Sequence, residues 1–150
     1  MMIYIVLDNY WKFFNIDIEK SLYKIAEKNN ISLKVLRIGY QNNIFIEAIR
    51  RFTYKIGLKT FLLKYKEMKE VQFLPEDYVI YFDIFREDKL EVLRNFTKNS
   101  KEIFWLWNKM EASKIEYLKT FSKNIWTFDK VDSEINNIKY SSQFYWRSNF

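Results

Sequence analysis

The chain has 150 residues, of which 49% are hydrophobic and 20% aromatic, with two glycines and one proline, a composition that predicts one folded domain and excludes a disordered chain. It contains no cysteine and no histidine, which excludes disulfides, thiolate or imidazole metal sites, and catalysis by histidine. The formal net charge is +6, which favours an anionic partner over a cationic one.

Apolar runs alternate with segments of helical periodicity along the whole chain. The runs predict five strands and a brief sixth, at 2–7, 31–38, 78–83, 102–107, 124–128 and 138–140. Helices are predicted between them, at 16–29, 43–56, 59–70, 87–98, 111–122 and 130–137. In the first helix we expect one apolar stripe to face the core, formed by Ile18, Leu22, Ile25 and Ala26.

This alternation predicts the fold class. Strands that are apolar on both faces and separated by helices are typical of a parallel sheet covered on both sides. The sequence therefore predicts an α/β, doubly wound, Rossmann-like domain of five or six strands that spans residues 1–150.

The segment 47–70 carries most of the positive charge. It contains seven bases and three acids, and the bases lie beside an apolar stripe that runs from Phe45 to Ile56. It is either a solvated face or an anion-binding surface, and a membrane with anionic lipids is the partner we expect. The residues expected to contact it are Arg50, Arg51, Lys55 and Lys59. The N-terminal segment lacks a signal-peptide pattern, which predicts a cytoplasmic protein.

The stretch IFWLWN, at 103–108, places two tryptophans on one face of a predicted strand. Trp105 is expected in the core, because helices should cover both faces there. Trp107 lies at the carboxyl end of the strand, where the cover becomes thinner, and it is either a core residue or part of a binding site.

Polar and aromatic residues follow the predicted strands at their carboxyl ends, where ligands bind in open α/β sheets. The residues are Asp8, Asn9, Tyr40, Asp83, Trp107, Asn108 and Asp129. Carboxylates and amides bind hydroxyl groups, and aromatic rings stack on the apolar faces of sugars. The set therefore predicts a site for a hydroxyl-rich ligand.

Each of these polar residues also has a structural interpretation. Asp83 and Asp129 precede predicted helices and are candidate helix caps, whereas Asn9 and Asn108 suit turns. The hypothesis of a binding site rests on the convergence of these residues at one edge of the sheet.

Several common sites are absent from the sequence. The first strand is followed by LDNYWKFFN rather than a glycine-rich phosphate loop, so no nucleotide cofactor or metal is predicted. A receiver-like module would place acids after the first and third strands, as Asp8 and Asp83 do. The first strand lacks the acidic pair of receivers, however, and the fourth ends in Trp-Asn instead of Ser or Thr.

Residues 78–146 resemble the N-terminal region of bacterial glycosyltransferases from lipopolysaccharide and capsular polysaccharide gene clusters. The motifs that carry the resemblance are YFD at 81–83, IFWLWN at 103–108, IWTFDKVDSE at 125–134 and KYSSQFYW at 139–146. Residues 1–77 are compatible with this family without carrying a specific motif.

The resemblance implies a GT-B-like enzyme of two domains, in which this chain is the acceptor-side half. A C-terminal domain absent from these 150 residues would bind the nucleotide sugar, so transfer of a hexosyl group by this chain alone is not expected. Without histidine, a carboxylate must deprotonate the acceptor. Asp8 or Asp83 is the expected base, and Trp107, Asn108 and Asp129 are expected to orient the glycan or lipid-linked acceptor.

Two further functions compete with this interpretation. One is a non-catalytic doubly wound interaction module or receiver-like module, which a native chain that ends at Phe150 would favour. The other is nucleic-acid binding through the basic segment. We rank it last because the bases are not interleaved with an aromatic stacking platform.

Overall fold

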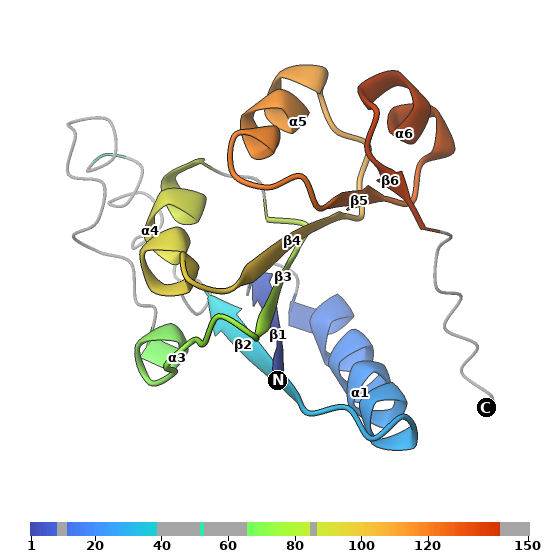
Figure 1. Ribbon diagram of the computed structural model, residues 1–150. Coiled ribbons are helices and arrows are strands. Elements are labelled where there is room, and N and C mark those ends of the chain that lie inside the picture. The colour runs from blue at the N-terminus through green and yellow to red at the C-terminus, as the bar shows by residue number, and fades with distance from the viewer. Residues whose placement is uncertain (9–11, 39–51, 53–65, 85–86, 142–150) are drawn as a thin grey trace.

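The computed structural model describes residues 1–8, 12–38, 52, 66–84 and 87–141 (Figure 1). Strands alternate with helices throughout this part of the chain, which confirms the predicted α/β class. The order is β1 (Ile3–Asp8), α1 (Lys12–Lys28), β2 (Leu33–Ile38), α3 (Lys66–Lys69), β3 (Tyr78–Phe82), α4 (Glu87–Thr97), β4 (Lys101–Leu106), α5 (Ala112–Lys119), β5 (Ile125–Thr127), α6 (Lys130–Asn136) and β6 (Lys139–Tyr140). The helix predicted at 43–56, and most of the one at 59–70, lie outside the described residues.

The strands form one parallel sheet in the order β2-β1-β3-β4-β5-β6. In Figure 1, α1 lies on one side of the sheet, and α3, α4, α5 and α6 lie on the other. Crossovers between parallel strands are right-handed. Because β2 lies on one side of β1 and the later strands lie on the other, the helix that connects β1 to β2 is on one face and the helices of the later connections are on the opposite face. The direction reverses between β1 and β3, and this switch point is where doubly wound sheets bind ligands.

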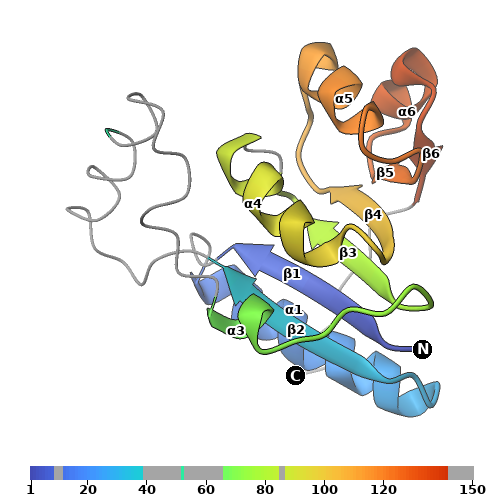
Figure 2. The same cartoon turned by 60° about the vertical axis from the view of Figure 1, so that its left-hand side comes forward.

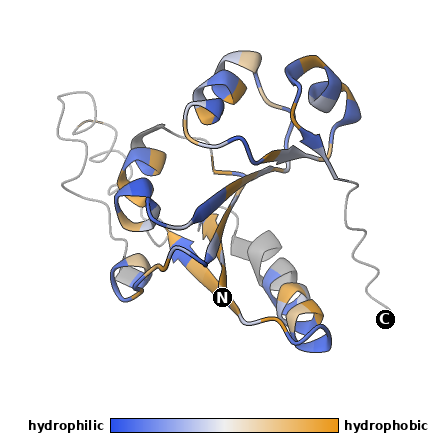
Figure 3. Ribbon diagram, in the orientation of Figure 1, coloured by the Kyte–Doolittle hydropathy of each residue, from blue (hydrophilic) through white to orange (hydrophobic). Residues whose placement is uncertain are grey.

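The larger core lies between the sheet and the helices α3, α4 and α5. Its fully buried side chains come from the strands and from these helices, and include Val6, Leu36, Met68, Tyr81, Leu90, Leu93, Phe104, Ile115 and Leu118. Figure 3 shows mainly hydrophobic colour on β1 and both colours on the helices, as expected for helices with one face in water. Burial of these side chains, each worth about 1.5–3 kcal/mol, holds the helices to the sheet.

Strand β4 alternates strictly between its two faces. Phe104 and Leu106 are fully buried, whereas Trp105 and Trp107 are only half-buried. The expectation that Trp105 is a core residue was therefore wrong. The helices that bury Phe104 lie on the opposite face, and among the described helices only α1 lies on the tryptophan face. It lies beneath β1 and β2 in Figure 2 rather than beneath β4.

Helix α1 covers a smaller core on its own face. Leu22 packs against a cluster that includes Ile5 and Val35, and Ala26 is buried. Ile25, which we expected in the same stripe, is 44% exposed. Among the described side chains of α1, Leu22 and Ala26 define the packed stripe. Ile25 lies about 100° from Ala26 around the helix, which places it outside that stripe.

Side chains from both faces cover the free edge of β2. The backbone N–H of Val35 donates to the Tyr23 hydroxyl of α1 at 3.2 Å, and the N–H of Arg37 donates to the Glu67 carboxylate of α3 at 2.7 Å. The Arg37 guanidinium is also paired with Glu19 of α1. These N–H groups lie on the side of β2 away from β1, so the edge has hydrogen-bond partners without a further strand.

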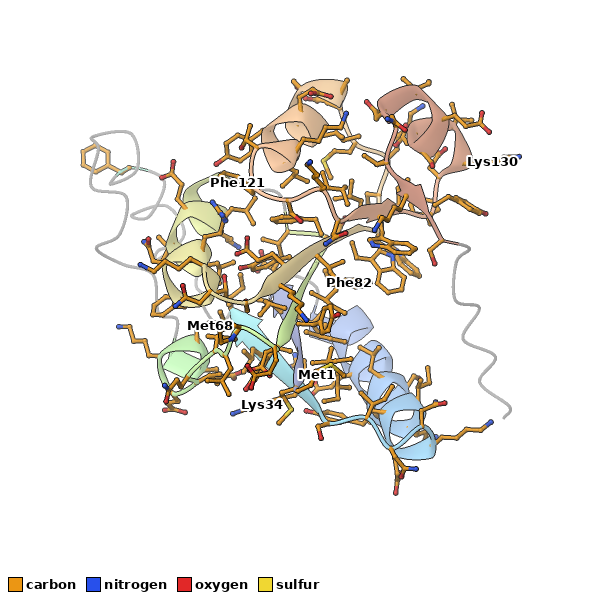
Figure 4. The ribbon with its side chains drawn as sticks, viewed as in Figure 1. Met1, Lys34, Met68, Phe82, Phe121 and Lys130 are labelled. Carbon is orange, nitrogen blue, oxygen red and sulfur yellow. The ribbon has the colours of Figure 1, made fainter. Side chains whose placement is uncertain are left out.

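A buried polar network lies towards the amino end of β4. Glu102 accepts hydrogen bonds from the Tyr81 hydroxyl at 3.2 Å, from Thr97 at 2.8 Å and from Arg94 at 3.0 Å. The Arg94 guanidinium also lies 4.4 Å from the centre of the Phe121 ring, between α4 and α5 (Figure 4). Burial raises the pKa of the Tyr81 phenol, and the neighbouring Glu102 carboxylate raises it further.

A second buried acid lies at the amino edge of the sheet. Asp77 is 3% exposed and precedes β3. Its carboxylate accepts from the backbone N–H groups of Met2 at 2.8 Å and Leu74 at 3.0 Å. Burial of the Tyr4 phenol raises its pKa, and the negative charge of Asp77 raises it further. Asp77 therefore joins the start of β1 to the loop that precedes β3.

Candidate functional site at the carboxyl edge of the sheet

Asp8 is the last residue of β1 and lies at the switch point of the sheet. Its carboxylate forms an ion pair with Lys89 from the first turn of α4. Lys89 is 7% exposed, so the ammonium group is largely removed from water and contributes a fixed positive charge beside Asp8. The register of β1 and β3 pairs Val6 with Tyr81, and each strand ends within two residues of this pair, so Asp8 and Asp83 lie at the carboxyl ends of neighbouring strands.

Asp83 follows β3 and has a left-handed backbone, with φ 52°. One carboxylate oxygen accepts from the backbone N–H groups of Trp107 at 3.1 Å and Asn108 at 3.3 Å. The other accepts from the side-chain amide of Asn108. Three hydrogen bonds thus join Asp83 to the residues that follow β4. These bonds hold the carboxylate against the residues that carry the Trp107 ring and the Asn108 amide.

Trp107 lies among aromatic rings at the same edge. Its ring centre is 5.5 Å from that of Phe82 and 6.1 Å from that of Phe128. Phe82 lies on the opposite side of the sheet from Met68 (Figure 4). Trp107 is half-buried, and Asn108 beside it is exposed. Together they provide an aromatic surface and an accessible amide beside the Asp83 carboxylate.

Asp129 forms the N-cap of α6. Its carboxylate accepts from the backbone N–H groups of Val131 at 2.8 Å and Asp132 at 3.1 Å. Asp132 in turn is buried and accepts from the N–H of Met110 at 3.2 Å. The structural interpretation of Asp129 as a helix cap is therefore confirmed, and its carboxylate helps to position the loop at the ends of β4 and β5.

The structure thus brings Asp8, Asp83, Trp107 and Asn108 to one edge at the ends of β1, β3 and β4. Lys89 was missed by sequence reasoning, although it is the third residue of α4, the helix that follows β3. Other predicted residues lie outside the described part of the chain and stay predictions. They are Asn9, Tyr40, Arg50, Arg51, Lys55 and Lys59.

The described residues contain no group of three acidic side chains that could bind a metal ion. In the same part of the chain, each helix is too short or too polar to cross a membrane. Comparison with protein-family models, with curated proteins and with solved structures finds no match for this chain.

Proposed function

We propose that the carboxyl edge binds the glycan or lipid-linked acceptor of a bacterial surface-polysaccharide glycosyltransferase. The observation that carries the proposal is the position of Asp8, a carboxylate at the switch point of the sheet with Lys89 beside it. Trp107 and Asn108 lie at the same edge and offer a ring for stacking and an amide for hydroxyl groups. The motifs YFD, IFWLWN and IWTFDKVDSE support the same family.

Within this proposal Asp8 is the better candidate for the base. Asp83 accepts three hydrogen bonds from the segment 107–108, which give it a positioning role, whereas Asp8 lies at the switch point with the Lys89 ammonium beside it. Asp83 then holds Trp107 and Asn108 in place against the sugar, and Asp129 supports the neighbouring loop. The proposal includes a cytoplasmic location near the inner face of the membrane, where lipid-linked acceptors are available.

The nucleotide sugar requires a second domain in this proposal. Alignment of donor and acceptor across a closed cleft supplies effective molarities of about 10⁵–10⁸ M, and in a GT-B-like enzyme that cleft lies between two domains. We therefore expect residues 1–150 to bind acceptor glycans weakly and to transfer no sugar on their own. Turnover of a nucleotide sugar by this chain alone would contradict that expectation.

Binding can be tested by NMR titration with a panel of short bacterial-type glycans. We expect Trp107→Phe and Asp8→Asn each to weaken binding about tenfold, since a good stacking or charged contact is worth roughly 1–2 kcal/mol. Trp126→Phe is the matched control, because Trp126 is also half-buried and its ring lies against Lys139 of β6, whereas that of Trp107 lies against Phe82 and Phe128. Equal losses in the Trp107 and Trp126 variants, or no binding to any glycan, would refute the proposed site.

The strand order supports an alternative, a non-catalytic doubly wound module. The order 2-1-3-4-5 is that of flavodoxin-like domains, including receivers, and the chain has it with β6 added. A fold of this kind serves many functions. In that case the carboxyl edge would contact a protein partner, and glycans would produce no chemical-shift changes at Trp107 or Asn108.

A further inference from the structure

Three lysines form a ridge along the outer face of α1, and we call Lys20, Lys24 and Lys28 the lysine ridge. They are spaced by four residues, so each lies about 6 Å along the helix from the next. All three are exposed. Within the described part of the chain, none of them is paired with an acid.

The ridge points away from the sheet because the opposite face of α1 is the packed one. Leu22 and Ala26 face the core, and Glu19 and Tyr23 reach towards β2. The lysines lie on the remaining side, with Glu27 as the exposed acid at their flank. In Figures 1 and 2, α1 stands apart from the other labelled helices, so its outer face is not shared with them.

Two exposed apolar side chains lie on α1 and in the turn that follows it. Ile25 is 44% exposed, and Ile31, in the turn after α1, is 40% exposed. A helix that lies in a membrane interface uses such residues, because lysines bind anionic headgroups while adjacent apolar side chains enter the boundary of the acyl chains.

We propose that the lysine ridge, with Ile25 and Ile31, docks this chain on an anionic membrane surface. The partner is chosen by its chemistry: its negative charge complements the ridge, and its apolar layer receives the two isoleucines. A nucleic acid would satisfy the lysines and leave the isoleucines in water. The inference deepens the proposed function, because a membrane is where a lipid-linked acceptor resides, and its test needs no glycan.

The test is co-sedimentation of residues 1–150 with vesicles, at low salt and at about 0.15 M salt. One set contains phosphatidylcholine alone, and the other contains equal parts of phosphatidylcholine and phosphatidylglycerol. We expect binding to the anionic vesicles only, and weaker binding at the higher salt. The variant K20Q/K24Q/K28Q should bind about a hundredfold more weakly, since loss of each lysine near such a surface costs about fivefold.

The matched control is K98Q/K123Q/K130Q, which removes the same charge from exposed positions on other elements and should retain most of the binding. Equal losses in the two triple variants would mean that only net charge matters, and they would overturn the inference. Unchanged binding in the ridge variant, or no binding by the unmodified chain, would also overturn it.

A second variant, Ile25→Ser, separates a membrane from other polyanions. It should weaken binding to anionic vesicles several-fold and leave binding to heparin unchanged. An equal response to both ligands, or tighter binding to RNA than to vesicles, would reject the membrane as partner. Because Ile25 and the ridge lysines are exposed, thermal melts of these variants should match that of the unmodified chain.

Discussion

The two ends of the sheet use carboxylates in different ways. At the amino end, Asp77 and Glu102 are 3% and 8% exposed and bind donors that are themselves partly or fully buried. At the carboxyl end, Asp83 and Asp129 are only half-buried, and they hold the backbone of loops that contact water.

This difference separates stability from function along one set of strands. An acid that is buried with several donors cannot exchange them for a ligand without a large desolvation cost. A half-buried acid keeps part of its hydration and can contact a ligand while its other bonds remain. The carboxyl end therefore has carboxylates that keep contact with water, and the amino end has carboxylates whose bonds are buried within the fold.

The largest effect is expected from Glu102→Ala at the amino end. The change leaves Tyr81, Thr97 and Arg94 without their shared acceptor, and the first two are fully buried. We expect a loss of about 3 kcal/mol in the free energy of unfolding, measured by urea denaturation. Asp129→Ala, at the carboxyl end, should cost only about 1 kcal/mol, as for other N-caps. Equal costs would remove the contrast between the two ends.

A double-mutant cycle between Asp83 and Asn108 tests the side-chain hydrogen bond that joins them at the carboxyl end. Asp83→Asn sets two amide donors against each other, and Asn108→Asp sets two carboxylates together, so each should cost about 1–2 kcal/mol. The double variant restores one donor and one acceptor and should recover at least about 1 kcal/mol of coupling. Purely additive losses in urea denaturation would show that the side-chain bond contributes nothing to stability.

A further effect, confined to alkaline pH, is a loss of stability caused by Tyr81. The folded state raises its pKa, so stability from the protonated phenol is complete below the unfolded value of about 10 and is lost as the pH rises above it. Between about pH 9 and about pH 11 the contribution of Tyr81 should fall by about 1.4 kcal/mol. Tyr81→Phe should reduce the pH dependence of unfolding in this range by that amount. An unchanged slope would show that Tyr81 ionises normally in the folded chain.

The alternation of apolar runs and helical periodicity was sufficient to predict the parallel sheet and the positions of its strand ends. Period-two alternation also placed Phe104 and Trp105 on opposite faces of β4 correctly. It could not predict which face would be buried more deeply. That depends on α4 and α5 lying on one side, which follows from strand order and crossover handedness.

The contacts of the candidate site were beyond prediction from local pattern. Asp8 and Lys89 are 81 residues apart, and Asp83 and Asn108 are 25 apart. Both pairs depend on the register between strands, which one sequence does not specify. Only the cap at Asp129 was predictable locally, because its donors lie two and three residues away.

The hydrogen bonds made by Val35 and Arg37 affect whether another strand can pair with β2. A strand added beyond β2 would have to displace Tyr23 from Val35 and Glu67 from Arg37. The backbone N–H groups of Val35 and Arg37 would then exchange one hydrogen bond each for another. Exposed sheet edges promote pairing between chains, and proteins that blunt them avoid it. The contacts of Tyr23 and Glu67 therefore disfavour the pairing of a further strand, from this chain or from a second copy, with this part of β2.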